Sequence, residues 1–325
     1  MPDYSAQNSG RSRMTCPKLA RAVIPSTTAA EGRLRVVSDM LIHAFMTPDL
    51  FQRVTAHGAA VNLSSRAKFR LTGGDRVRYL NGQVTNDVRR ANADETLYAC
   101  VTDAKGRIAA DVFVHAHEDT LLLDAEGDVR ETLGMRLERY IVADDVELTD
   151  VTEEWQLWHV FGSAETPAHA LRSNRFGVPG FDLWLPAAAA APTFDTIDVL
   201  TDAELETWRI VQKVPRWPNE LNAEMFPPEA GLESRAMDFT KGCYIGQEVL
   251  SRIKTTGKMP RELIAFDTDS PVNAGDEILT TKAVGSVTSV TVHPETGRIV
   301  GLAMVRQGMT AEPLSTSAGV LLRPR

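Results

Sequence analysis

The sequence predicts an α+β fold that ends in a small all-β domain. Two patterns in the chain carry this prediction. Between residues 74 and 161, strand-like segments alternate with helical ones and are joined by short hairpin turns. After Pro260 only short strand-like segments follow, as in a small barrel. A doubly wound sheet is not predicted, because neither Gly-x-Gly-x-x-Gly nor a Walker-type loop occurs.

The first predicted helix starts after Gly74. Asp75 is a plausible N-cap, apolar residues recur behind it at helical spacing, and Gly82 is expected to interrupt or end the helix. Three strands are predicted next, the last two forming a hairpin. They are Tyr98–Thr102, Ile108–His115 and Thr120–Asp124.

An amphipathic helix is predicted over Asp128–Tyr140, because its apolar residues line up on one face. Thr201-Asp202-Ala203-Glu204 is a capping box and predicts the start of another helix. The remaining strands are expected in two sets, before and after the helix that starts at Thr201. They are Val146–Leu148, Trp155–Phe161, Glu262–Asp267, Glu277–Leu279, Ala283–Val292 and Ile299–Val305.

Composition narrows the classes of function. A net charge of −8 argues against nucleic-acid binding through a globally basic surface, so we expect no direct nucleic-acid contact. Three scattered cysteines make neither a disulfide framework nor a metal site, and no apolar stretch approaches the ~20 residues of a membrane span. His115 and His117 share a strand face, which we interpret as a solvated edge with no metal.

Length and local composition divide the chain. Its 325 residues exceed the ~250–300 at which single cores stop growing, so two or three domains are expected. Residues 1–39 carry six basic and three acidic residues among many serines and threonines. We predict a disordered extension there, while a transit peptide has the same composition. Residues 259–325 are predicted to form the β-barrel domain.

The most informative motif is Lys241-Gly242-Cys243-Tyr244-Ile245-Gly246-Gln247-Glu248. It places one thiol between a cation and two glycines, ahead of a short amphipathic segment. A nearby positive charge favours the reactive thiolate, and the glycines allow positive φ or a close approach to a ligand. A buried, inert cysteine in a tight turn is the alternative interpretation.

This run resembles the signature of the YgfZ family of folate-binding proteins, relatives of the glycine-cleavage T-protein. The resemblance covers about residues 46–306 and extends to four further strings. They are Asn81-Gly82-Gln83-Val84-Thr85-Asn86-Asp87, Asp103-Ala104-Lys105-Gly106-Arg107, Trp208-Arg209-Ile210 and Pro228-Glu229-Ala230-Gly231-Leu232. T-proteins have a related Phe-Ile-Gly string without the cysteine, so the cysteine motif distinguishes the two groups.

The resemblance implies a three-domain ring whose channel holds tetrahydrofolate, with residues 40–258 forming two interleaved α+β domains. It assigns Cys243 and Asp111 as catalytic residues, although Asp111 could equally be a solvent-facing strand residue. The residues expected to bind the cofactor are Lys241, Gly242, Tyr244, Gly246, Gln247, Arg209, Asn81 and Gln83. The residues of the Asn81–Asp87 string could instead only cap and turn the chain.

One position departs from the resemblance. Many relatives have a glutamate after the Arg-Ile pair, where its carboxylate suits the paired N–H donors of a pterin. Here Val211 follows Ile210 and offers no acceptor. Loss of one charge-assisted hydrogen bond costs about 1.5–3 kcal/mol. Three outcomes are open: Glu206 or Glu224 substitutes, folate binds weakly, or the pocket takes another ligand.

Three functions fit these observations. The first is a folate-dependent accessory protein that supports the maturation or repair of iron–sulfur enzymes, including tRNA-modifying ones, through a Cys243 thiol. The second is an aminomethyltransferase that passes a one-carbon unit to tetrahydrofolate, and the third is a non-catalytic scaffold that docks an iron–sulfur protein. We expect a cytoplasmic monomer, or a mitochondrial-matrix protein if the basic N-terminal segment is a transit peptide.

Overall fold

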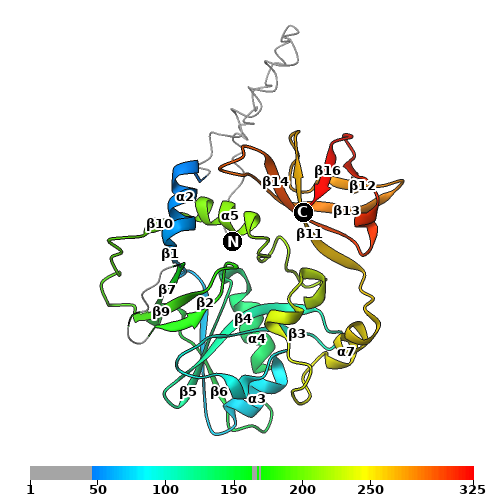
Figure 1. The fold of residues 1–325 in the computed structure, drawn as a ribbon. Helices are drawn as coiled ribbons and strands as arrows, with labels where there is room; N and C mark the ends of the chain where they lie inside the picture. The colour runs from blue at the N-terminus through cyan, green and yellow to red at the C-terminus, as the bar shows by residue number, and fades with distance from the viewer. Residues whose placement is uncertain (1–45, 163–166, 168–169) are drawn as a thin grey trace, which may run out of the picture. The chain divides into compact units, whose positions relative to one another are not determined.

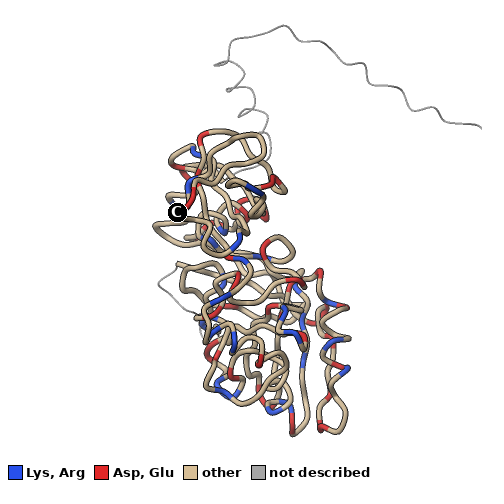
Figure 2. Tube along the Cα trace, turned by 90° about the vertical axis from the view of Figure 1, so that its right-hand side faces the viewer, with Lys and Arg blue, Asp and Glu red and all other residues tan. Residues whose placement is uncertain are grey.

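The computed structural model describes residues 46–162, 167 and 170–325 and shows a mixed helix and strand fold (Figure 1). The predicted extension at residues 1–39, with Cys16, lies outside the described residues. The described strands form two five-stranded sheets and one closed barrel. Basic and acidic residues are interspersed along the chain (Figure 2).

The first sheet has the strand order β3-β4-β5-β2-β6, with every pair antiparallel. Helices α3 (Arg76–Gln83) and α4 (Arg130–Glu138) share an apolar core with this sheet, to which α3 gives Leu80 and α4 gives Leu133 and Leu137. The strands are β2 (Ala67–Thr72), β3 (Leu97–Thr102), β4 (Ile108–His117), β5 (Thr120–Ala125) and β6 (Glu147–Asp150).

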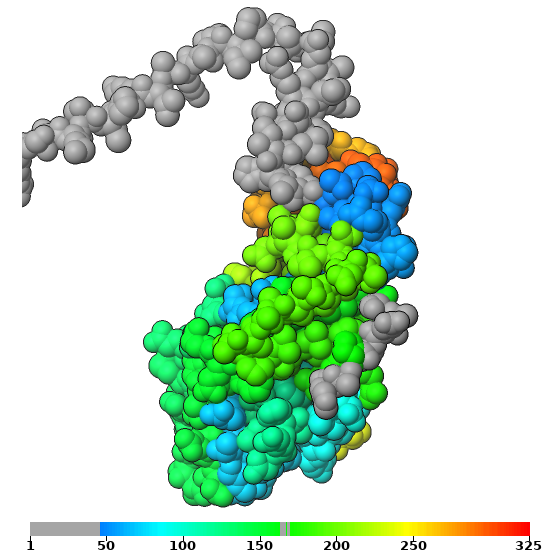
Figure 3. Space-filling model, turned by 90° about the vertical axis from the view of Figure 1, so that its left-hand side faces the viewer, coloured from blue at the N-terminus to red at the C-terminus, as the bar shows by residue number. Residues whose placement is uncertain are grey.

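The second sheet has the order β10-β1-β7-β9-β8, in which only β1 and β10 run parallel. Phe51 of α2 (Pro48–His57) and Trp208 of α5 (Asp202–Val211) pack on one of its faces. In Figure 3, α2 (blue) lies beside the green residues of this region. The strands are β1 (Ala59–Asn62), β7 (Trp155–Phe161), β8 (Leu171–Ser173), β9 (Gly180–Pro186) and β10 (Asp198–Leu200).

The C-terminal strands close into the expected barrel, in the order β11-β14-β13-β12-β15-β16. Leu263 and Leu302 on its outer side share an apolar cluster with Ile108 of β4 and Ile210 of α5. This cluster fixes the barrel against the rest of the fold. The strands are β11 (Arg261–Thr268), β12 (Glu277–Leu279), β13 (Ala283–Val292), β14 (Ile299–Arg306), β15 (Leu314–Thr316) and β16 (Leu321–Pro324).

Short helices connect α5 to the barrel. Helix α6 (Glu233–Ala236) precedes the cysteine motif, and α7 (Gln247–Thr256) begins with its last two residues. Single 3₁₀ turns lie between the longer elements. They are η1 (Val88–Arg90), η2 (Gly127–Val129), η3 (Thr152–Glu154), η4 (Pro227–Ala230) and η5 (Met309–Ala311).

Two expectations about local structure are wrong. Gly82 does not end the first predicted helix, because α3 continues to Gln83 and an added Cβ at Gly82 would meet no atom within 4 Å. His115 is not on a solvated edge: it is 2% exposed and lies 4.9 Å from the ring of Trp184 on β9. The second sheet covers this strand, and an isolated strand pattern could not reveal that cover.

Candidate functional site

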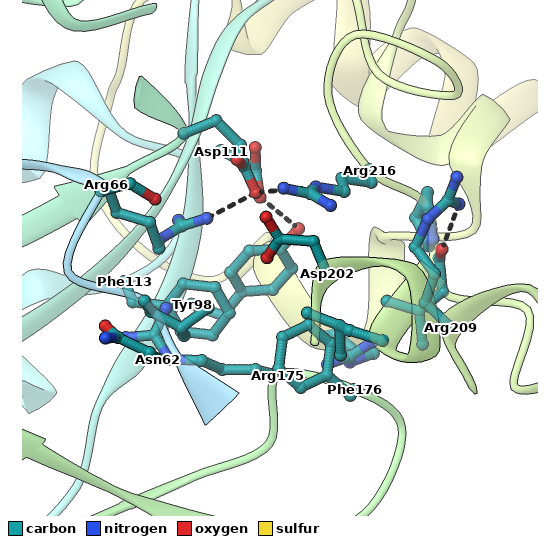
Figure 4. Close-up of a pocket in the computed structure, with 17 residues that line it drawn as sticks. Asn62, Arg66, Tyr98, Asp111, Phe113, Arg175, Phe176, Asp202, Arg209 and Arg216 are labelled. Atoms are coloured by element: carbon teal, nitrogen blue, oxygen red, sulfur yellow. Dashed lines mark hydrogen bonds and ion pairs between the residues drawn. The ribbon is translucent and has the colours of Figure 1, made fainter. Parts of the chain in front are cut away.

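A cavity opens where the two five-stranded sheets meet α5 and the loop after it (Figure 4). It contains about 770 Å³ of space free of atoms, part of which is open solvent. Its wall combines aromatic and aliphatic side chains with arginines, carboxylates and the uncharged polar residues Asn62 and Ser65. The labelled residues are Asn62, Arg66, Tyr98, Asp111, Phe113, Arg175, Phe176, Asp202, Arg209 and Arg216.

Asp111 is the predicted catalytic residue that the structure places in this cavity. Asp111 and Phe113 stand two residues apart on β4 and therefore share one face of the strand. The Asp111 carboxylate accepts a hydrogen bond of 3.1 Å from the Tyr98 hydroxyl and is 8% exposed. Burial raises the pKa of Asp111, and the positive charge of Arg66 partly opposes the rise. A carboxyl group in this setting can exchange a proton with a ligand.

Arginines and carboxylates pair around the cavity. Glu126 accepts from Arg66 at 2.7 Å and lies 3.4 Å from Arg216. The guanidinium of Arg175 lies 3.9 Å from the centre of the Phe113 ring. Arg175 also joins the two sheets, because it donates to Asp124 on β5 and to Asp182 on β9 at 2.7–3.0 Å. These ion pairs fix the side chains of the cavity wall.

Arg209 lines the cavity but is occupied within the protein. It is 1% exposed, and each of its five N–H groups donates to a neighbouring oxygen. The acceptors are the Glu206 carboxylate, Glu220 at 2.8 Å, the Val214 main-chain oxygen at 3.2 Å and the Ser289 hydroxyl of β13 at 2.7 Å. The arrangement ties α5 to the barrel, so Arg209 positions the cavity wall.

The structure shows that the departure at Val211 does not change the cavity wall. This valine lies outside the cavity lining and packs against the apolar clusters beneath α5. Neither proposed substitute, Glu206 or Glu224, lines the cavity. The carboxylates that do are Asp111, Glu126 and Asp202. The exposed Asp202, at the first position of α5, lies toward the cavity in Figure 4 and makes no ion pair with a described residue.

The cysteine motif lies in a second region, away from the cavity lining. Lys241 is 5% exposed, and its ammonium donates to the main-chain oxygens of Asn81, Val84 and Asn86 at 2.6–2.7 Å. Burial lowers the pKa of Lys241 to about 8, which leaves the ammonium as the major form at neutral pH. Lys241 thus holds the turn after α3, and not the Cys243 thiolate that the sequence suggested as its target.

The two glycines of the motif differ in what the backbone requires of them. Gly246 has φ +88°, and an added Cβ would lie 2.6 Å from the Asp103 oxygen and 2.8 Å from Cα of Gly106. Gly242 has no positive φ, and a Cβ there would meet nothing within 4 Å. Only Gly246 is therefore needed for the loop to dock on the turn between β3 and β4.

The other predicted residues lie around the same loop. Cys243 is exposed, whereas Tyr244 is buried and its pKa rises to about 12 because of burial. Gln247 is the first residue of α7. The Asn81 side chain accepts from the Val88 amide at 2.9 Å, and the Gln83 side chain accepts from Arg136 at 3.0 Å. Asn81 and Gln83 thus make local contacts, and a cofactor-binding role for them stays a prediction.

One hairpin connects the two regions. At the end of β3, the Thr102 hydroxyl donates to the main-chain oxygen of Ile245 in the cysteine loop at 2.5 Å. Four residues earlier on the same strand, Tyr98 faces the cavity and binds Asp111. Four residues of extended chain span about 13 Å. The predicted residues therefore form two groups. Asp111 and Arg209 line the cavity, and the others lie around the cysteine loop. The β3–β4 hairpin contacts both groups.

Sequence reasoning missed several residues of the cavity wall: Arg66, Tyr98, Phe113, Glu126, Arg175 and Arg216. Tyr98 and Phe113 read as ordinary strand residues, and the arginines have no fixed spacing to one another. Within residues 46–162, 167 and 170–325, no group of three potential metal ligands is found. No helix among the described residues is long and apolar enough to cross a membrane.

Comparison with known proteins identifies the class first. Residues 49–168 match the family described as the GCVT N-terminal domain. The fold resembles the crystal structure of glycine cleavage system aminomethyltransferase T from Bartonella henselae, with a TM-score of 0.73, 15% identity and coverage of 85% of this chain and 88% of that one. The chain therefore has the fold of the glycine-cleavage T-protein.

Sequence relatives make the identification more specific. The chain is 28% identical to the tRNA-modifying protein YgfZ of Sodalis glossinidius over 67% of this chain and 74% of that protein. It is 29% identical to the mitochondrial iron-sulfur cluster assembly factor IBA57 homolog of Pyricularia oryzae, over 78% and 68% respectively. The chain is thus similar in sequence to proteins named YgfZ and IBA57 and has the fold of an aminomethyltransferase T.

Proposed function

We propose that this protein binds tetrahydrofolate or a one-carbon derivative and supports iron–sulfur enzymes, including enzymes of tRNA modification. The observation that carries the proposal is the cavity with the buried Asp111 carboxylate on its wall. The names of the YgfZ and IBA57 relatives support the accessory role. The clients would be iron–sulfur enzymes of the cytoplasm or, if the basic N-terminal segment is a transit peptide, of the mitochondrial matrix.

The lining of the cavity fits the chemistry of a folate. Tyr98, Phe113 and Phe176 contribute aromatic surface to the wall against which the rings would pack. Asp111 and Asp202 offer carboxylate acceptors for the N–H donors of a pterin, which makes Asp202 the candidate to replace the acceptor missing at Val211. Bound folate would supply one-carbon chemistry, and the part of Asp111 would be to hold or release a proton beside it.

Calorimetry with tetrahydrofolate tests the cofactor. Ser65 is exposed and lines the cavity, so Ser65→Trp should block the space without removing a core contact. We expect saturable binding to the natural chain and a loss of at least tenfold in Ser65→Trp. Ser317→Trp, an exposed position on the barrel, is the matched control and should bind normally. Absence of binding to the natural chain would refute the folate proposal.

The second part of the proposal is that Cys243 acts as a functional thiol. Its exposed position in the loop leaves it accessible to a partner. In a deletion strain with a tRNA-thiolation defect, Cys243→Ala and Cys243→Ser should both fail to restore thiolation, although their melting temperatures equal that of the natural chain. Full rescue by either variant would refute the thiol role. Partner binding that needs neither folate nor the thiol would instead favour the docking scaffold.

An aminomethyltransferase is the second candidate function, because the fold resembles aminomethyltransferase T. It predicts carbon transfer from an aminomethylated lipoyl carrier to tetrahydrofolate. The exposed Cys243 is in a motif that T-proteins lack, so we expect no turnover in a direct assay of methylene-tetrahydrofolate formation. Clear turnover that is lost in Asp111→Asn would make this candidate the leading one.

A further inference from the structure

A second cavity lies beside the first one. Its wall contains three arginines, Arg90, Arg172 and Arg235, and one acidic residue, Glu95. We call these four residues and the space they enclose the arginine groove. The groove holds about 1010 Å³ of space free of atoms, part of it open solvent. It is a locally cationic site in a chain whose net charge is −8.

Two of these arginines are available to a ligand. Arg90 lies 3.8 Å from the carboxylate of Asp238, and Arg172 lies 3.6 Å from that of Glu95. Both separations exceed normal hydrogen-bond length, and the two arginine side chains are 68% and 67% exposed. A guanidinium with unused N–H groups binds carboxylate oxygens in a bidentate fashion. Arg90 and Arg172 therefore present two guanidinium groups, each of which can bind a carboxylate.

The groove adjoins the first cavity. Tyr98, Phe113 and Arg235 belong to the walls of both. The rings of Tyr98 and Phe113 stack with their centres 4.5 Å apart, and the guanidinium of Arg235 lies 5.5 Å from the centre of the Tyr98 ring. The groove therefore lies where an anionic chain attached to a ligand in the cavity would emerge beside these shared residues.

We propose that the arginine groove binds the oligo-γ-glutamyl tail of a polyglutamylated folate. The inference rests on the proposed function, in which the cavity holds the ring system. Each γ-linked glutamate adds one carboxylate, which matches the guanidinium groups of Arg90 and Arg172. A nucleic-acid backbone fits less well, because the acidic chain repels a long polyanion outside this small patch.

Calorimetry with tetrahydrofolate carrying one or five glutamates tests the inference. The pentaglutamate should bind the natural chain about tenfold more tightly than the monoglutamate, as expected for exposed arginine–carboxylate contacts. This gain should shrink as ionic strength rises. The double variant Arg90→Gln/Arg172→Gln should lose the gain and keep its affinity for the monoglutamate.

The control removes the same number of charges elsewhere. Arg70 and Arg78 lie on other elements and pair with exposed or half-buried carboxylates, so Arg70→Gln/Arg78→Gln should keep the gain. Equal affinity for both folates in the natural chain would overturn the tail site and leave the proposed function standing. A gain that persists in Arg90→Gln/Arg172→Gln would overturn it too. If neither folate binds, the proposed function and the tail site both fail.

Discussion

The ammonium of Lys241 lies 2.6 Å from the main-chain oxygen of Asn81, a residue 160 positions earlier in the chain. This contact joins the two strings that the sequence singled out separately, the turn after α3 and the cysteine motif. A cation that satisfies three main-chain oxygens replaces the capping that the end of a helix needs. The cysteine loop is therefore built on the end of α3.

Replacement of Lys241 should destabilise the protein. Lys241→Met leaves three main-chain oxygens without their donor, and we expect a loss of about 3 kcal/mol or more in the free energy of unfolding. Urea denaturation measures it. Lys105→Met, at an exposed lysine in the β3–β4 turn, is the control and should change stability by less than about 0.5 kcal/mol. Similar values for the two variants would contradict the role of Lys241.

Alanine at the two glycines of the motif should have opposite outcomes. Gly246→Ala places a Cβ against Asp103 and Gly106 at positive φ, so we expect a loss of about 1–3 kcal/mol in the free energy of unfolding. Gly242→Ala meets open space and should change it by less than about 0.5 kcal/mol. Thermal denaturation of both variants is the measurement. A larger effect at Gly242 than at Gly246 would show that the loop docks in another way.

Asp111 should make stability depend on pH. Its pKa is raised in the folded state, so the folded chain holds a proton that the unfolded chain has released once pH exceeds the ordinary value of about 3.9. Stability from this residue is therefore present at low pH and is lost as pH rises through the folded pKa. As pH rises from 4.5 to 8, the melting temperature of Asp111→Asn should therefore increase relative to that of the natural chain. Asp119→Asn, in an exposed turn, controls for the lost carboxylate; a pH-independent difference for Asp111→Asn would contradict the prediction.

Arg175 should be among the most sensitive charged residues. Arg175→Met leaves Asp124 and Asp182 buried with fewer donors, and we expect a loss of about 3–5 kcal/mol in the free energy of unfolding. Urea denaturation checks this value. Arg70→Met removes a partly exposed partner of Glu154 and should cost less than about 1 kcal/mol. A loss below about 1 kcal/mol for Arg175→Met would mean that the two carboxylates find other partners.

Local patterns predicted much of the fold. The capping box at Thr201 starts α5, and three predicted strands, Trp155–Phe161, Glu277–Leu279 and Ala283–Val292, have the observed bounds. Helix α2 was missed, although Pro48 at its first position and the Thr47 cap are helix-start signals. Strand β8 has only three residues, and it pairs with β9 through contacts that no local pattern records.

The site was only partly predictable. The family resemblance points to Asp111, but its burial and its hydrogen bond with Tyr98 are not visible in the sequence spacing. The charge of Lys241 is visible in the sequence, yet its acceptors are main-chain oxygens, which carry no sequence signature. The arginine groove joins Arg90 to Arg172, which are far apart in the chain. Long-range pairing of charged residues requires the fold.

The β3–β4 hairpin has a thermodynamic consequence, because one end holds Asp111 and the other holds the cysteine loop through Thr102 and Ile245. Local opening of the hairpin would expose both ends together, and any ligand that binds Asp111 reduces the population of that open form. The amide of Ile245 donates to the main-chain oxygen of Gly82 at 3.1 Å. With such a ligand bound, this amide would exchange its hydrogen with solvent more slowly. By linkage, a partner that binds the cysteine loop would raise the affinity of the cavity for its ligand by the same factor by which the ligand raises the affinity for the partner.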